Sequence, residues 1–534
     1  MTDRGPRADV CVIGAGPAGA LVAHRAAKAG YSVVVLDAGP RFDFEGRSER
    51  EERAIRPGSS KPPWNMGEEG GHGKRDAYTS SGPKEYPLNT ARVKGVGGST
   101  LHWQGMVMRL HERDFRLHSE TGMGVDWPLS YADLRPYYAR AERAFGVAGA
   151  SDNPFAPPRT TPFPLPAFPP SHSDAMFAEA CESLEITTHS VPNARNSESY
   201  RGRSECLGYG TCKPVCPSGA KYDATATIDG AEKAGAVVID RAPVQHLEHD
   251  DAGDRVVAAV YATPDGKTHR QEASEFVLAA GGVEIPRLLL LSKSPQYPDG
   301  LANSSGLVGR YFTDHFFAGV GGVVDERTRQ HHVGFNTTES HQFYDQPADG
   351  SRTAIKLEFW NYAGPTPADI ALSGSSLGDD LLDNIREEYG NHLAVGALVE
   401  QVPQYENRVT LDDSKTDDHG NPVPEIVWSL DDRTRRTIER ANRIQHRIMD
   451  ELDANVRWVI GPEKTGPAFH HMGTTRMGTD PKSSVVGPDM RTHDLDNLTV
   501  AGSSVFPTTG AMNPTLTIAA LSLSAADELL DRLA

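Results

Sequence analysis

The first residues with recognisable chemistry are Gly14, Gly16 and Gly19, which stand between the first apolar run of the chain and its first helical pattern. Glycines at this spacing let the backbone turn tightly and approach a pyrophosphate, and the helix that follows offers free N–H groups and a positive dipole. Asp37 ends the next apolar run, where an acid accepts hydrogen bonds from an adenosine ribose and disfavours a ribose 2′-phosphate. The pattern predicts a dinucleotide site but does not separate FAD from NAD. No second copy is present, which argues against an enzyme that passes hydride from NADPH to a flavin.

A second group with chemistry is a cysteine cluster. Three of the five cysteines, Cys206, Cys212 and Cys216, fall within eleven residues. An odd, clustered set in a chain that begins without a signal-peptide pattern favours metal or redox chemistry over disulfides. Glycines and prolines make the segment a loop, and Pro217 follows the last cysteine, as at many iron–sulfur sites. Three thiolates match the three irons of a 3Fe-4S cluster, whereas structural zinc wants a fourth ligand. Zinc, a labile cluster and unligated buried thiols are the alternatives.

These groups need a framework of strands and helices. Apolar runs favour buried parallel strands, and apolar positions at helical spacing favour helices. The expected strands are 10–13, 32–36, 276–280 and 498–500, and the expected helices are 18–29, 131–145, one beginning at Pro286, and 515–533. Between 310 and 460 the pattern changes to alternating strands, such as 392–399 and 408–411, and a long amphipathic helix at 433–452. We therefore expect a βαβ nucleotide-binding part and a separate sheet-and-helix part.

Length and charge exclude several classes of function. The chain has 534 residues and a net charge of -18, from 72 acidic and 54 basic residues, which argues against nucleic acid or an anionic membrane as a direct partner. Lysine is scarce, with 14 residues against 40 arginines, and both a high-salt cytoplasm and a GC-rich genome give this bias. No run of 18 apolar residues and no signal-peptide pattern is present. We expect no membrane span and, by the chain's own sequence, a cytoplasmic location.

Four further segments match one protein family in order and spacing. They are Gly95 through Trp103, Ala280 through Leu289, His470 through Gly478, and Val505 through Pro514. With them the chain resembles the glucose-methanol-choline (GMC) flavin oxidoreductases. The resemblance implies an α/β fold, with a Rossmann-like FAD-binding domain built from discontinuous segments and an inserted α+β substrate domain that contains an antiparallel sheet. The FAD-binding segments would be 1–150, 200–310 and 465–534, and the substrate segments 151–199 and 311–464.

The resemblance also implies a catalytic pair. Oxidation of an alcohol by hydride transfer needs a base for the hydroxyl proton, and histidine suits this task at neutral pH. In the family the base is the histidine of a His-x-x-Gly-Thr segment, which corresponds to His470, and a later polar residue corresponds to Asn513. An asparagine there donates a hydrogen bond to the developing alkoxide. The neighbouring His471 is either a packed histidine or the alternative base.

The same resemblance assigns contacts to FAD. They come from Gly97, Gly98, Val244, Ala280 and Pro514, in addition to Gly14, Gly16, Gly19 and Asp37. His102 stands four residues after Gly98, where some members of the family bond the flavin covalently. A covalent bond at His102 and a non-covalent wall of the flavin pocket are both open.

The loop at 206–216 resembles the iron–sulfur loop of the catalytic subunits in bacterial FAD-dependent glucose dehydrogenase complexes, with Leu207 where those proteins carry a further cysteine. The resemblance implies a dehydrogenase of a sugar, polyol or sugar acid that passes electrons from FAD through a 3Fe-4S cluster to a cytochrome or quinone-linked acceptor. It also implies two partner subunits, a small one with an export signal and a cytochrome. Through these partners the folded chain would be exported or held at a membrane. An oxygen-using alcohol or pyranose oxidase is the runner-up. A non-redox lyase and a flavin-binding electron-transfer or assembly subunit are rivals from other classes.

Overall fold

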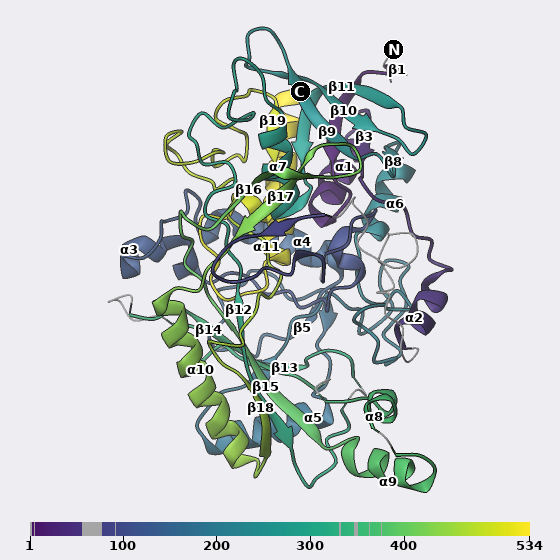
Figure 1. The fold of residues 1–534 in the computed structure, drawn as a ribbon, viewed down its shortest axis with the longest axis vertical. Coiled ribbons are helices and arrows are strands. Elements are labelled where there is room, and N and C mark those ends of the chain that lie inside the picture. Colours follow the sequence, from purple (N-terminus) through teal and green to yellow (C-terminus); the bar gives the residue numbers. More distant parts are fainter. Residues whose placement is uncertain are drawn as a thin grey trace.

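Two large β-sheets lie toward opposite ends of the long axis of the molecule (Figure 1). The structure is a computed structural model that describes residues 3–4, 6–55, 77–90, 92–330, 333–345, 351–361, 364–374 and 376–534. Both chain termini lie at the upper end in Figure 1, beside the sheet that contains the glycine motif.

The upper sheet starts with the predicted βαβ unit. It consists of β2 (Ala8–Ile13), α1 (Pro17–Lys28) and β3 (Val33–Leu36), and β8 (Val237–Ile239) pairs in parallel with β3. Val10 and Val12 pack in one apolar cluster, while Cys11 and Ile13 pack in another. Both faces of the strand are therefore covered, which explains why the run is continuously apolar.

One long strand joins the distant segments of this sheet. The C-terminal half of β11 (Thr268–Leu278) lies between β2 and β19 (Leu498–Val500), and both pairs are parallel. The other half of β11 pairs antiparallel with β10 (Val256–Ala262), which pairs with β9 (Val244–His249), and β1 (Asp3–Arg4) pairs in parallel with β11. The predicted Rossmann-like sheet built from discontinuous segments is confirmed.

Four helices pack together beside this sheet. Helix α1 contacts both α6 (Thr225–Lys233) and α11 (Thr515–Leu533), and α11 contacts α4 (Tyr131–Phe145). The bounds of α4 match the prediction because both ends carry local signals. The hydroxyl of Ser130 accepts from the backbone N–H of Asp133, whose carboxylate accepts in return, and Gly146 ends the helix with φ +71°.

The lower sheet is antiparallel, as predicted. Its order is β18 (Asn455–Ile460), β12 (Phe316–Val323), β15 (His392–Val399), β14 (Ile355–Phe359), β13 (Thr338–Ser340) and β7 (His189–Ser190). Helix α10 (Asp432–Glu451) lies along this sheet in Figure 1 and buries Ile438, Ala441 and Ile448 against it. Asp431 caps the helix by accepting from two backbone N–H groups of its first turn.

A small third sheet lies between the two. It consists of β16 (Arg408–Thr416), β17 (Pro422–Val427) and β4 (Thr79–Ser80), and its first two strands pack against α7 (Gly281–Leu291). The hairpin therefore belongs by sequence to the predicted substrate segment 311–464 but contacts a helix of the predicted FAD-binding segment 200–310. The domain boundaries themselves stay a prediction.

The remaining elements are short or peripheral. They are the helices α2 (Arg47–Ile55), α3 (Leu117–Thr121), α5 (His172–Ser183), α8 (Pro367–Ser373) and α9 (Asp379–Glu388), the strands β5 (Ala148–Gly149) and β6 (Leu165–Pro166), and 3₁₀ turns at Leu88–Thr90, Gly98–Leu101, Glu112–Arg116 and Ser503–Val505. Among the described helices, none combines the length and apolar character needed to cross a membrane.

One predicted helix start is wrong. Helix α7 begins at Gly281 rather than at Pro286, so the proline lies inside the helix. The sequence prediction placed Pro286 in the first turn, where its missing N–H costs nothing. The true first turn packs closely at Gly282, where a Cβ atom would lie 2.5 Å from the carbonyl oxygen of His471. This contact brings the helix start to the segment that carries the predicted base.

Candidate active site

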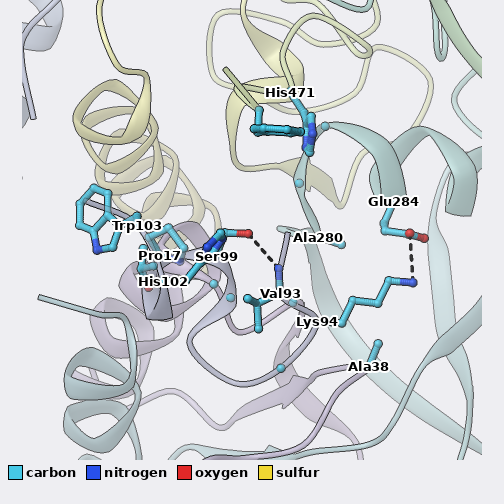
Figure 2. Close-up of a pocket in the computed structure, with 18 of the residues that line it drawn as sticks. Pro17, Ala38, Val93, Lys94, Ser99, His102, Trp103, Ala280, Glu284 and His471 are labelled. Carbon is cyan, nitrogen blue, oxygen red and sulfur yellow. Dashed lines mark hydrogen bonds and ion pairs between the residues drawn. The ribbon is translucent and has the colours of Figure 1, made fainter. Parts of the chain in front are cut away.

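A single large cavity receives residues from both sheets. Its volume is about 1260 Å³, and its lining runs from the glycine motif at the upper sheet to Phe317, Glu358 and Leu398 of the lower sheet. Figure 2 shows its cofactor side, with Pro17, Ser99, His102 and Trp103 on one wall and His471 above. Predicted residues that line the cavity are Gly14, Gly16, Asp37, Gly98, His102, Val244, Ala280, His470, Asn513 and Pro514.

The glycine motif has the geometry of a dinucleotide cradle. Gly14 has φ +106°, and a Cβ atom on it would lie 2.6 Å from the carbonyl oxygen of Ala279. A Cβ on Gly19 would collide with the carbonyl oxygen of Gly14, whereas a Cβ on Gly16 would meet no protein atom within 4 Å. Gly14 and Gly19 are therefore needed for packing, and Gly16 leaves open space over the N-terminus of α1 for a phosphate.

A second glycine turn closes on the first. Gly98 has φ +55°, and a Cβ atom there would lie 3.0 Å from the Cα atom of Gly16. Gly97 does not line the cavity, but its φ of +108° makes the turn into the 3₁₀ segment that ends before His102. Gly19 and Gly97 thus shape the predicted cofactor site from behind its walls.

Asp37 is fixed at the predicted ribose position. Its two carboxylate oxygens accept from the backbone N–H groups of Ala15, at 2.8 Å, and Gly39, at 2.9 Å. Burial raises the pKa of Asp37, and these two N–H groups oppose that effect. Each oxygen keeps a further lone pair, so the carboxylate can accept from ribose hydroxyls. Asp37, the glycine cradle and the large cavity together fit a dinucleotide such as FAD.

The predicted base, His470, is held from two sides by the loop before β12. Its backbone N–H donates to Asp314 Oδ1 at 2.9 Å, and its Nδ1 lies 2.8 Å from Nδ1 of His315. Asp314 is fully buried and also accepts from the hydroxyl of Tyr86 and from the backbone N–H of His315 at 2.7 Å. Phe469, before His470, has φ +64°, a costly conformation for a bulky residue that persists only where its surroundings determine it.

The predicted hydrogen-bond donor, Asn513, is held by a buried lysine. Lys356 Nζ lies 2.6 Å from Asn513 Oδ1 and 2.7 Å from Glu358 Oε1, and Glu339 Oε2 lies 3.6 Å away. Lys356 and Glu339 have no exposed surface. Two carboxylates near one ammonium compensate its charge, as a buried charge requires.

His470 and His471 differ in their surroundings. Burial, and after it the electrostatic interactions with His315 and Lys356, hold the pKa of His470 well below its usual range, so its ring is neutral at pH 7. His471 packs against Tyr86 and Phe312, burial lowers its pKa to about 3, and its buried Nε2 has no hydrogen-bond partner among the described residues. Both rings line the cavity, and only His470 has a second histidine against it.

Sequence reasoning missed the polar residues on the lower-sheet side of the cavity. Glu358 and Trp360 line it, and the Trp360 Nε1–H donates to Glu358 Oε2 at 3.1 Å. A Cβ atom on Gly396 would collide with the Trp360 ring, so the glycine in β15 makes room for the indole. Alternation predicted β15, but the sequence analysis did not name β14 and no motif singled out Glu358, Lys356 or His315.

The cysteine loop, residues 206–216, contributes to the wall of the same cavity, but its three cysteines do not line it. Its residues Gly210, Thr211, Lys213 and Pro214 line the cavity, while the Cys212 and Cys216 side chains are buried and Cys206 is half-buried. The Cys216 thiol accepts from the Lys221 backbone N–H at 3.4 Å. Burial opposes ionisation, but this N–H and the Lys221 ammonium hold the pKa of Cys216 below its usual value.

The three cysteine sulfurs do not gather around one point. Among the described residues, one group brings three metal-ligand atoms within 4.8 Å of one another. It consists of His189, Glu339 and His341 and includes none of the cysteines. The cysteines therefore do not form a single-ion site such as zinc in this arrangement. Within the histidine group, His341 Nδ1 lies 2.9 Å from the Asn153 amide and His341 Nε2 lies 3.0 Å from Glu339, whereas the buried Nε2 of His189 has no hydrogen-bond partner among the described residues.

Family comparisons agree with the two-part architecture. The GMC oxidoreductase family models match residues 79–317 with their N-terminal part and 403–522 with their C-terminal part. An NAD(P)-binding Rossmann-like domain model matches residues 12–58, around the glycine motif. The matched residues contain His102, His470 and Asn513.

Two curated relatives align along nearly the whole chain. The fructose dehydrogenase large subunit of Gluconobacter japonicus is 36% identical over 556 residues, covering 100% of this chain and 99% of the relative. The 2-methyl-1,2-propanediol dehydrogenase of Mycolicibacterium austroafricanum is 31% identical, covering 99% and 96%. Among solved structures, formate oxidase from Aspergillus oryzae superposes with a TM-score of 0.71 at 16% identity, covering 100% of this chain and 99% of the other, which indicates a shared fold.

Proposed function

Because the chain belongs to the GMC oxidoreductase family, we propose that it is an FAD-dependent dehydrogenase that oxidises a CH–OH group of a sugar, a polyol or a sugar acid. The observation that carries the proposal is one cavity lined by the dinucleotide cradle, by His470 and by Asn513. Bound FAD would supply the two-electron acceptor for the hydride. The chain's own residues bind the alcohol, take its proton and stabilise the oxygen that loses it.

His470 acts as the base in this proposal. Its ring is neutral at pH 7 because burial lowers its pKa, so it can accept the hydroxyl proton. Asn513 donates from its amide to the same oxygen as negative charge develops there. We assign His471 to the wall of the cavity, since its ring packs against Tyr86 and Phe312.

The lower-sheet wall supports a polyhydroxylated substrate. The carboxylate of Glu358 offers acceptors to hydroxyl groups, and Trp360 offers an apolar ring beside it. The two dehydrogenase relatives are named for fructose and for 2-methyl-1,2-propanediol, which are both small polyols or sugars. We extend this substrate class to the present chain.

We propose that Cys206, Cys212 and Cys216 bind a 3Fe-4S cluster, with one thiolate for each iron. Each thiolate would bind its own iron, so the three sulfurs need not surround a single metal ion. The cations of Lys221 and Arg195 act on Cys216 and compensate thiolate charge. The cluster would accept electrons one at a time and deliver them to a cytochrome or quinone-linked partner.

Partner subunits are part of the same proposal. The name of the Gluconobacter relative identifies it as a large subunit. We propose a small subunit with an export signal and a cytochrome subunit for this chain also, with the chain cytoplasmic unless such a partner carries it across or to a membrane.

The test is an anaerobic titration of purified holoprotein with sugars, polyols and sugar acids, followed by visible and electron paramagnetic resonance spectra. Bleaching of the flavin band by one of these alcohols, with a paramagnetic iron–sulfur signal, is the expected result. No bleaching by any alcohol would favour a lyase or a non-catalytic flavin subunit. Peroxide formation in air as fast as turnover with artificial acceptors would instead identify an oxygen-using oxidase.

A further inference from the structure

We propose that His315 and Lys356 are positioning residues that fix the polarity of the catalytic pair, so that an acceptor on His470 and a donor on Asn513 face the same substrate oxygen. This inference rests on the proposed function. It concerns two residues of the lower-sheet part that no sequence motif marks. His315 immediately precedes β12, and Lys356 lies in β14.

The neutral His315 ring carries its proton on one of its two nitrogens, and its hydrogen bonds show which one. Its Nε2 lies 2.8 Å from the carbonyl oxygen of Gly510, and a carbonyl can only accept a hydrogen bond. Nε2 of His315 therefore carries a proton. The ring is completely buried, and burial lowers its pKa to about 4, so it is neutral at pH 7. A neutral imidazole has one N–H, which leaves Nδ1 of His315 as an acceptor.

The hydrogen bond between the two histidines decides which ring nitrogen of His470 carries the proton. The two Nδ1 atoms are 2.8 Å apart, a distance that requires one proton between them. Since Nδ1 of His315 is the acceptor, Nδ1 of His470 is the donor. The neutral His470 ring then has its lone pair on Nε2. His470 lines the cavity, so this tautomer provides the base that alcohol oxidation needs.

Lys356 fixes the orientation of the Asn513 amide. An ammonium group has donors and no acceptor, so Lys356 can bind only the carbonyl oxygen of this amide. Lys356 Nζ lies 2.6 Å from Asn513 Oδ1, and the same nitrogen lies 2.7 Å from Glu358 Oε1 and 3.6 Å from Glu339 Oε2. The amide oxygen is thereby held by Lys356. The NH₂ group remains to donate to the substrate oxygen.

The alternative is that both residues serve stability alone. His315 and Lys356 are fully buried and hydrogen-bonded, and many such residues are structural. The alternative predicts that their substitution lowers stability and slows the reaction by an amount that does not depend on His470 or Asn513. Positioning predicts that the effect of each substitution disappears when the group that it positions is absent.

The test is a pair of double-mutant cycles on the holoenzyme, measured as the rate of anaerobic flavin reduction by the alcohol found most active. His315→Leu removes the acceptor, and we expect a loss of about 100-fold. In a His470→Ala background the same change should alter the rate by less than about twofold. Lys356→Met should behave likewise with Asn513→Ala. His315→Gln, which offers both an acceptor and a donor, should restore most of the rate.

The control is His249→Leu, which removes a histidine hydrogen-bonded to Asp250 and Ser294 at the end of β9, away from the cavity lining. It should leave the rate unchanged. Equal losses from His315→Leu in the wild-type and His470→Ala backgrounds would overturn the inference. A His470→Ala variant with wild-type rate would instead overturn the assignment of the base in the proposed function.

A measurement on the unsubstituted protein keeps the inference testable if the variants do not fold. Histidine-selective ¹⁵N labelling reports by NMR which ring nitrogen of each histidine carries the proton. We expect His470 with its proton on Nδ1 and His315 with its proton on Nε2, the two rings being assigned as a histidine pair whose Nδ1 nitrogens are coupled to each other across their hydrogen bond. The opposite tautomer at His470 would overturn the inference.

Discussion

The ammonium of Lys221 lies 2.8 Å from the carbonyl oxygen of Cys212 and also donates to the carbonyl groups of Leu101 and Trp103. Those two residues flank His102 in the wall of the cavity. Lys221 is almost completely buried, and burial lowers its pKa to about 8, opposed by the cysteines beside it. One buried cation therefore joins the cysteine loop, where we propose the cluster, to the wall of the cavity, where we propose the cofactor.

This link predicts that Cys212→Ser separates flavin reduction from electron delivery. Anaerobic flavin reduction by substrate should stay near the wild-type rate, because the hydride step that we propose uses His470 and Asn513 and not the cysteines. Transfer to a cytochrome or quinone-linked acceptor should collapse, while small dyes that reach the flavin still support turnover. Iron and sulfide analysis, flavin content and stopped-flow spectra measure these effects.

Cys181→Ala is the matched control, since Cys181 is a buried thiol in α5 outside the loop. It should retain iron, flavin and both rates. Wild-type protein prepared anaerobically without iron and sulfide, or a Cys212→Ser variant with full transfer to the partner, would reject the cluster and favour the oxidase.

The glycine cradle predicts different effects for two neighbouring substitutions. Gly16→Ala should leave the stability of the apoprotein unchanged, because its Cβ meets no protein atom and the backbone is extended. It should weaken FAD binding at least about tenfold, or about 1.4 kcal/mol. Gly14→Ala should destabilise the apoprotein by about 1–3 kcal/mol, because φ is +106° and the Cβ would press on Ala279. Thermal unfolding and FAD titration distinguish the two. Equal FAD affinity in Gly16→Ala and the wild type would contradict the cradle.

His102 is the residue through which the flavin could be attached covalently. It lines the cavity directly after the 3₁₀ segment Gly98–Leu101, beside Trp103 (Figure 2). If His102 is bonded to the flavin, acid-precipitated wild-type protein will stay yellow, and His102→Ala will release its FAD into the supernatant. A colourless wild-type precipitate would mean that His102 is a non-covalent wall.

The pH dependence of flavin reduction follows from burial of His470. Its pKa lies well below the ordinary 6.5 because burial, and after it the electrostatic interactions with His315 and Lys356, disfavour the protonated ring. The base form therefore persists as the pH falls through 6.5, and the rate should decline only well below that value. Stopped-flow reduction over a pH series, with flavin content checked at each pH, measures this. A decline centred at or above pH 6.5 would contradict a buried, neutral base.

Local signals account for what the sequence predicted of the fold. The β2–α1–β3 unit and α11 have continuous or periodic apolar patterns, and α4 has a cap at each end, so their bounds were close to those observed. Helix α7 began earlier than predicted because packing of Gly282 against His471, a contact between distant segments, decides its start.

The candidate site was only partly predictable for the same reason. Gly14, Asp37 and His470 lie in motifs whose spacing carries their chemistry. His315 and Lys356 stand next to or within strands and acquire their roles only when the sheet brings them to His470 and Asn513. The dipeptide Asp314-His315 before an apolar strand was the available signal, because two polar residues at a buried strand start need partners.

The central claim is that His470 takes the proton while hydride leaves the alcohol. The most direct measurement compares anaerobic flavin reduction by the best sugar or polyol in wild-type protein and in His470→Ala, at equal FAD content. The account predicts rapid bleaching of the flavin in the wild type and a loss of about 100-fold or more in the variant. Reduction of the variant at near the wild-type rate would contradict the claim and move the base to His471.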